Sequence, residues 1–85
     1  MTLAPNSPEA RDIAYHFHSY TDAMAHAEQG PQIIEHGEGV FVFDNHGKRY
    51  VEAMAGLWSV GVGFGEDRLV AAAAEQMKKL PYYHN

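Results

Sequence analysis

Cysteine is absent from this 85-residue chain, and basic residues are few. Without cysteine there is no disulfide framework and no thiolate chemistry, which fits a reducing compartment. Six lysines and arginines stand against eleven aspartates and glutamates, and the basic residues form no stripe. The electrostatic footprint that nucleic acid or an anionic membrane requires is therefore missing. We expect neither of these partners.

Long hydrophobic runs are also missing. No apolar stretch approaches the roughly 20 residues that a helix needs to cross a bilayer, and residues 1–10 hold no apolar signal-peptide core. We therefore expect a cytoplasmic protein. A chain of 85 residues can form one small domain, whose core is marginal in size. Its many aromatic residues favour a segment that docks onto more protein.

Two stretches carry helix signals. Ser7-Pro8-Glu9 places an N-cap serine, a first-turn proline and a first-turn acid in order. The helix that follows is expected to end near His18-Ser19, with apolar residues spaced along one face: Ala10, Ile13, Ala14 and Phe17. The clearest helix is residues 67–80, which Pro81 ends. Its expected buried stripe is Leu69, Val70, Ala73, Met77 and Leu80.

The segment from Tyr20 to Gly30 is ambiguous. Thr21 or Asp22 is suited to cap a short helix that Gly30-Pro31 would end, and an irregular arm is about equally consistent with the sequence.

Three short strands are predicted between residues 32 and 54. Residues 32–36 form the first strand, and residues 37–39 form the turn after it. Residues 40–43 and 49–52 alternate in side-chain character on either side of Asp44-Asn45-His46-Gly47, which suits a type I turn closed by a left-handed glycine. The acids Glu35, Glu38 and Glu52 are expected on solvated faces.

The expected fold is therefore an α+β segment. It comprises a helix and arm (1–31), a three-stranded antiparallel sheet (32–54), a loop rich in glycine and carrying the tryptophan (55–66), and a C-terminal helix (67–80).

The loop after the strands is unusual because residues 53–65 carry no charge. Its Gly61-x-Gly63-x-Gly65 run does not match a dinucleotide fingerprint, which would need glycine where Glu66 stands. The glycines are better explained by sharp bends and close packing. Trp58, the only tryptophan, is either a core residue or the rigid wall of a ligand pocket. On physical grounds alone the core interpretation is favoured.

Other chemistry finds no support in the sequence. The six histidines show no HExxH spacing and no cysteine partner. His16 and His18 would point to nearly opposite sides of a helix, and His26, His36, His46 and His84 are scattered. We therefore expect no metal site. No nucleophile elbow and no paired carboxylates suggest a hydrolase.

Three stretches together resemble a known family. HGEGVFVFDNHGKRYVEAMAGLWSVGVGFG, followed by LVAAAAEQMKKLPYYH, resembles the N-terminal segment of class III (ω-) aminotransferases of the amine–pyruvate and β-alanine–pyruvate type. Upstream, HFHSYTDAMAHAEQGP resembles the arm in which two histidines precede an aromatic residue and Thr-Asp. Ser19 stands where the family commonly has proline, which affects only local geometry.

The resemblance implies an α/β enzyme of fold type I that uses pyridoxal 5'-phosphate (PLP). Such enzymes are homodimers that move an amino group from an amine or ω-amino acid to a keto acid such as pyruvate. The substrate-binding positions of the family match Tyr20, Leu57 and Trp58.

The same resemblance places the catalytic and cofactor-binding residues outside this chain. The large cofactor-binding domain is absent, and Lys48, Lys78 and Lys79 match no catalytic position. The segment alone is then expected to be inactive and not to bind PLP, with the remainder of the polypeptide as its main partner. The alternative is a small, non-catalytic α+β interaction module whose apolar loop is a docking patch.

Overall fold

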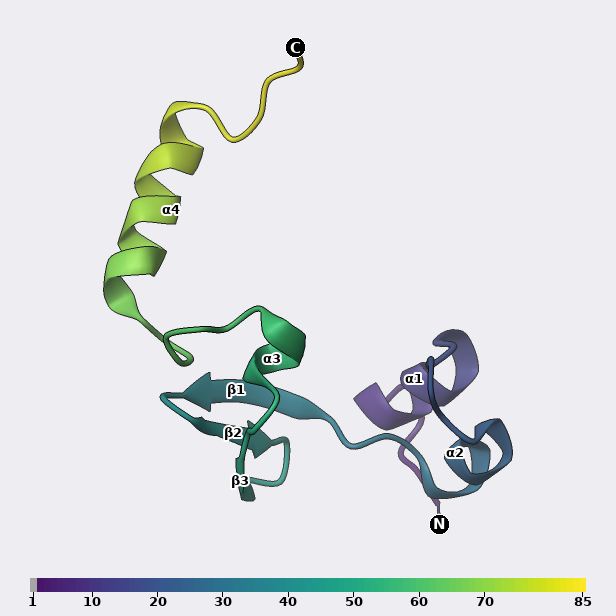
Figure 1. Cartoon of the computed structure of the whole chain (residues 1–85). Coiled ribbons are helices and arrows are strands. Elements are labelled where there is room, and N and C mark those ends of the chain that lie inside the picture. The colour runs from purple at the N-terminus through teal and green to yellow at the C-terminus, as the bar shows by residue number, and fades with distance from the viewer. Residues whose placement is uncertain (1) are drawn as a thin grey trace. The chain divides into compact units, whose positions relative to one another are not determined.

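The computed structural model describes residues 2–85. It forms two compact units that divide between Glu35 and His36. Its elements in chain order are α1 (Pro8–Tyr15), α2 (Ala23–Gln29), β1 (Ile34–Glu38), β2 (Phe41–Asp44), β3 (Arg49–Val51), α3 (Ala55–Trp58) and α4 (Asp67–Lys79) (Figure 1). Helices with a three-stranded antiparallel sheet confirm the expected α+β segment.

Helix α1 begins as predicted but ends early. The Ser7 hydroxyl oxygen accepts a hydrogen bond from the Ala10 N–H at 3.2 Å. The predicted end near His18-Ser19 is wrong, because His16 already has an extended backbone (φ −108°, ψ 125°). The His18 ring turns back to Asp12, with 2.8 Å between Nε2 and Oδ1. Phe17 consequently lies outside the helix and is exposed.

Residues 23–29 form a helix rather than an irregular arm. Asp22 is the cap, because its Oδ1 accepts hydrogen bonds from the N–H groups of Met24 (3.0 Å) and Ala25 (3.1 Å). The Thr21 hydroxyl instead donates to the Ser19 carbonyl. Gly30 ends the helix with φ +76°, a conformation that glycine adopts at little cost. Figure 1 shows α1 and α2 as neighbouring short helices within one unit.

The β2–β3 hairpin is organised by Asp44. The two strands pair in antiparallel register, with Phe41 opposite Val51 and Phe43 opposite Arg49. Asp44 Oδ1 accepts hydrogen bonds from the N–H groups of His46 and Lys48, both at 2.9 Å. Gly47 has φ +83°, which confirms the predicted turn with its left-handed glycine.

Asp44 is also the single buried charged side chain in residues 2–85, with 8% exposure. The Tyr50 hydroxyl donates to its Oδ2 at 2.8 Å. This hydrogen bond, together with the backbone N–H of Lys48, lowers the pKa of Asp44 and outweighs the opposing effect of burial.

Strand β1 begins and ends two residues later than predicted, and the expected turn at residues 37–39 is wrong. Gly37 and Glu38 belong to the strand, and Gly39 forms a bridge to Phe64. The Gly39 N–H donates to the Phe64 carbonyl at 2.9 Å, and the Phe64 N–H donates back at 2.8 Å. A Cβ on Gly37 would lie only 2.6 Å from the Phe64 ring. The glycine is therefore needed for close approach, not for a turn.

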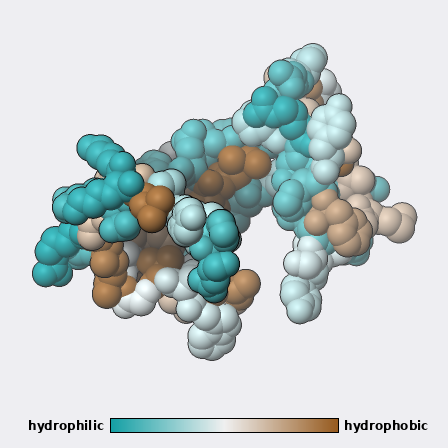
Figure 2. Space-filling model, turned by 90° about the horizontal axis from the view of Figure 1, so that it is seen from above, coloured by the Kyte–Doolittle hydropathy of each residue, from teal (hydrophilic) through white to brown (hydrophobic). Residues whose placement is uncertain are grey.

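No hydrophobic side chain within residues 2–85 is buried. The predicted buried stripe of α4 is exposed along its whole length, because nothing in the described chain packs on it. Figure 2 accordingly shows apolar residues in brown at the surface, among hydrophilic ones. In the part of the chain that the structure describes, no helix has the length and apolar character that crossing a bilayer requires.

Candidate functional site

The charge-free loop contains a short left-handed turn, α3. Its backbone φ angles are +50° at Ala55, +60° at Gly56, +68° at Leu57 and +68° at Trp58. A left-handed conformation brings Cβ close to the following carbonyl and costs roughly 1–2 kcal/mol for each residue other than glycine. Strained backbone of this kind clusters at functional sites. The observed strain therefore marks this turn as a candidate site.

The side chain of Glu52 stabilises the entrance to this turn. Its carboxylate accepts hydrogen bonds from the N–H groups of Met54 and Gly56, both at 2.8 Å. Ala55 then accepts from the N–H of Val60 at 2.7 Å. Strand periodicity did not predict this role, because it places Glu52 on a solvated strand face. The sequence feature that could have indicated this role is the position of Glu52, directly before an uncharged run that contains glycine.

The turn presents two of the three predicted substrate-binding residues. Leu57 is 67% exposed and Trp58 is 90% exposed. The interpretation of Trp58 as a core residue is therefore wrong for this chain. The strained backbone of this turn thus holds a rigid aromatic side chain outward.

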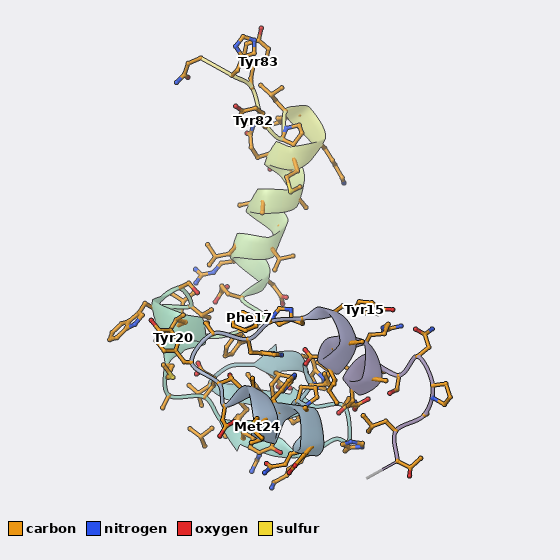
Figure 3. All side chains as sticks on the ribbon, turned by 90° about the vertical axis from the view of Figure 1, so that its right-hand side faces the viewer. Tyr15, Phe17, Tyr20, Met24, Tyr82 and Tyr83 are labelled. Carbon is orange, nitrogen blue, oxygen red and sulfur yellow. The ribbon has the colours of Figure 1, made fainter. Side chains whose placement is uncertain are left out.

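Tyr20, the third predicted residue, shares the same backbone feature. It lies in the loop between α1 and α2 with φ +54° and a fully exposed side chain. Figure 3 labels it together with Phe17 and Met24, two other exposed apolar residues of this unit. Besides Tyr20, Leu57 and Trp58, the only non-glycine residues with positive φ in residues 2–85 are Asn6 and Ala55. All three predicted substrate-binding residues thus occupy strained positions, although Tyr20 belongs to a different compact unit from Leu57 and Trp58.

A second group of titratable side chains comes from α1, the loop after it and α2. Asp12 Oδ1 is 2.8 Å from His18 Nε2 and 3.0 Å from His26 Nε2. The His16 and His26 rings lie on either side of the His18 ring, with centroids at 4.3 Å and 4.6 Å from it. Partial burial acts to raise the pKa of Asp12, but the hydrogen bond from His18 and the charges of these histidines outweigh it, so the pKa is lowered. Sequence spacing did not reveal this group, because a loop brings its members together.

The lysines and the glycine loop make local contacts in the residues described. Lys79 pairs with Glu75 at 2.9 Å on an exposed helix face, and Lys48 lies 5.1 Å from the centre of the Tyr50 ring. The glycine loop leads to the Glu66 carboxylate, which pairs with Arg68 at 3.0 Å and would repel a phosphate.

Comparison with known proteins decides the family. The model of the family "Aminotransferase class-III" matches residues 23–84. The chain belongs to the class III aminotransferases. These enzymes depend on PLP, and the expected relationship to their N-terminal segment is confirmed.

Several relatives of this class III aminotransferase chain are close in sequence or structure. A putrescine–pyruvate aminotransferase of Pseudomonas aeruginosa is 44% identical over 70 residues, which are 82% of this chain and 15% of the relative. A solved transaminase with L-alanine is 67% identical with a TM-score of 0.88, over 95% of this chain and 19% of that one. The ω-transaminase of Pseudomonas jessenii in complex with PMP is 54% identical with a TM-score of 0.86, over 92% of this chain and 17% of that one.

One further solved relative is an engineered enzyme. It is a thermostable ω-transaminase variant in which a tryptophan is replaced by glycine, made for the asymmetric synthesis of enantiopure bulky amines. It is 52% identical to this chain with a TM-score of 0.86, over 92% of this chain and 17% of that one. The class III aminotransferase chain thus spans less than a fifth of the length of each relative compared here.

Proposed function

We infer that this chain is the N-terminal segment of a PLP-dependent ω-transaminase that moves an amino group from an amine or ω-amino acid to a keto acid such as pyruvate. The observation that supports this most directly is the strained turn Ala55–Trp58, which holds Leu57 and Trp58 outward. It occurs in a chain that closely matches amine and pyruvate transaminases. Strain and exposure at these residues are expected if a substrate pocket is completed by other parts of the enzyme.

The roles proposed for this chain are binding and size selection. Tyr20, Leu57 and Trp58 would line the pocket for the amine substituent, because aromatic and aliphatic walls fix the volume of an apolar site. PLP would supply the electron-sink chemistry when it is bound by the remainder of the polypeptide. We propose that this remainder, with a second copy of it in a homodimer, covers the apolar surfaces exposed here. The same exposed residues suggested an interaction module, and coverage by the rest of an enzyme explains them equally well.

The test is a substitution in the complete enzyme that carries this chain. Trp58→Ala should change the ratio of kcat/KM between bulky and small amines by roughly 10- to 200-fold, which corresponds to about 1–3 kcal/mol of discrimination. The measurement is alanine formation from pyruvate with a series of amines. PLP content, read from its absorbance, should not change.

Two controls separate pocket shape from folding. Trp58→Phe keeps an aromatic wall and should shift the ratio less than the alanine variant does. If Trp58→Ala slows all amines equally, or loses PLP, then Trp58 is a structural anchor. If the wild-type enzyme forms no alanine with any amine, the proposed reaction itself is wrong.

A further inference from the structure

The cluster of Asp12, His18 and His26 is not used by the function proposed above. It joins α1, the loop after it and α2 within one compact unit. One ligand atom from each residue lies within 4.8 Å of the other two. All three side chains are partly buried, with exposures of 17% for Asp12, 32% for His18 and 12% for His26. Two imidazoles and one carboxylate are a ligand set that binds divalent first-row transition metals.

The orientation of His26 is the decisive detail. Its Nε2 is 3.0 Å from Asp12 Oδ1, yet this buried atom has no hydrogen-bond partner. By contrast, His18 Nε2 is aligned with both carboxylate oxygens, at 2.8 Å and 2.9 Å. An unprotonated nitrogen at this distance from a carboxylate would be repelled, and a protonated one should point at the oxygen. The His26 ring is neither turned away from the carboxylate nor aligned with it for a hydrogen bond.

A cation shared by the two groups accounts for this arrangement. In a hydrogen bond the proton lies near the line between nitrogen and oxygen, whereas a metal ion lies off that line. Zinc bonds of about 2.0–2.1 Å at a tetrahedral angle separate neighbouring ligand atoms by about 3.3 Å. The separations of 2.8 Å and 3.0 Å from Asp12 Oδ1 are a few tenths of an ångström shorter. Small side-chain rotations would bring them to ligand distance.

We propose that Asp12, His18 and His26 form a binding site for a divalent transition-metal ion of the zinc type, which ties α1 to α2. Metal binding releases to solvent the proton that His18 Nε2 shares with Asp12; Asp12 and the two Nε2 atoms then supply three ligands, and a water molecule completes the coordination. A surface depression whose lining includes His18 and His26 gives solvent access beside the cluster. The site departs from the sequence-based expectation of no metal, and it does not depend on the transaminase proposal.

The first experiment titrates the full 85-residue chain with zinc chloride at neutral pH. We expect one Zn²⁺ to bind per chain by calorimetry. The imidazole NMR resonances of His18 and His26 should shift, while that of His46, which lies in an exposed hairpin turn, should not. This measurement needs no substitution. Absence of binding at a ratio of one to one, or an equal shift of all histidines, would overturn the proposal.

The second experiment uses matched variants. His18→Gln, His26→Gln and Asp12→Asn should each weaken zinc affinity at least about tenfold, since even groups that only support a metal ligand commonly contribute this much. His46→Gln removes a histidine of the same kind elsewhere and should bind zinc as the wild type does. Zinc should also slow amide hydrogen exchange in α1 and α2 of the wild type and of His46→Gln only, because binding to the folded unit stabilises it. If His26→Gln keeps wild-type affinity, the three residues are an ion-pair cluster and not a metal site.

Discussion

At the scale of single residues, carboxylates that accept hydrogen bonds fix much of the local backbone conformation. Asp44 holds the hairpin turn, Glu52 holds the entrance to the left-handed turn, and Asp22 caps α2. Each accepts two or more hydrogen bonds, mainly from backbone N–H groups that would otherwise lack a partner. In a chain with so little core, such polar contacts are a large part of what fixes the backbone.

Removing the Tyr50 hydroxyl should change the acid stability of the hairpin. The pKa of Asp44 is lowered chiefly by the hydrogen bond from Tyr50. Ionised Asp44 therefore stabilises the hairpin above its unfolded pKa of about 3.9, and this contribution is lost as pH falls through the lower, folded pKa. In Tyr50→Phe the pKa of Asp44 should rise towards its usual value, so the contribution to stability is smaller and its loss is complete at a higher pH.

The measurement is a carboxyl-carbon NMR titration of Asp44, followed alongside the hairpin amides. Tyr15→Phe is the control, because Tyr15 is exposed on α1 and lies in the other compact unit. An unchanged Asp44 titration in Tyr50→Phe would show that the backbone donors alone set its pKa.

At the scale of elements, the sheet and the glycine loop are joined by close backbone contacts. Gly39 and Phe64 exchange two hydrogen bonds, and the Phe64 ring lies against Gly37. A Cβ on Gly63 would come within 2.9 Å of the Gly39 carbonyl oxygen. Gly37 and Gly63 are therefore explained by the close approach at this junction.

Replacing Gly37 by alanine should break this junction between β1 and the glycine loop. In Gly37→Ala the new methyl group would overlap the Phe64 ring, and overpacking of this kind costs about 1–3 kcal/mol. Amide hydrogen exchange at Gly39 and Phe64 should become faster, because their mutual hydrogen bonds are strained. Gly61→Ala is the matched control, since nothing lies within 4 Å of a Cβ there. Equal exchange rates in the two variants would mean that the Phe64 ring moves aside freely.

At the scale of the whole molecule, the residues described form secondary structure without a buried apolar core. Apolar surface normally supplies most of the free energy of folding when it is removed from water. Here it lies on the α4 stripe, on Leu57 and Trp58, and on the aromatic residues of the N-terminal unit. The chain also covers only 15–19% of the relatives' length, which fits the proposal that the remainder of the enzyme covers this surface.

The isolated chain should therefore associate with itself or unfold without a sharp transition. Exposed apolar patches of this kind normally meet other protein, and so small a scaffold rarely gains more than about 3–5 kcal/mol from its core. Analytical ultracentrifugation, urea denaturation and quenching of Trp58 fluorescence by acrylamide would measure this. Trp58 should be fully accessible to the quencher in the isolated chain and protected in the complete enzyme. A monodisperse monomer with a cooperative transition would contradict the expectation.

The sequence by itself determined the local elements. Ser7 and Pro8 start α1, the Asp44-to-Gly47 turn sets the hairpin, and Pro81 follows the end of α4, because caps and turns depend on neighbouring residues only. The family was also readable from the motifs around Leu57 and Trp58. Even the strained positions of Tyr20, Leu57 and Trp58 coincide with residues singled out by resemblance.

Only the tertiary structure decided how distant residues meet. Helical periodicity correctly identified the apolar stripe of α4 but predicted burial for it, since periodicity shows which face is apolar and not what covers that face. Likewise, Gly39 pairs with Phe64 directly after β1, a contact that no local pattern encodes. His18 and His26 meet at Asp12 because α1 ends early and the chain turns back. Spacing along the chain does not fix distance in space once a loop intervenes.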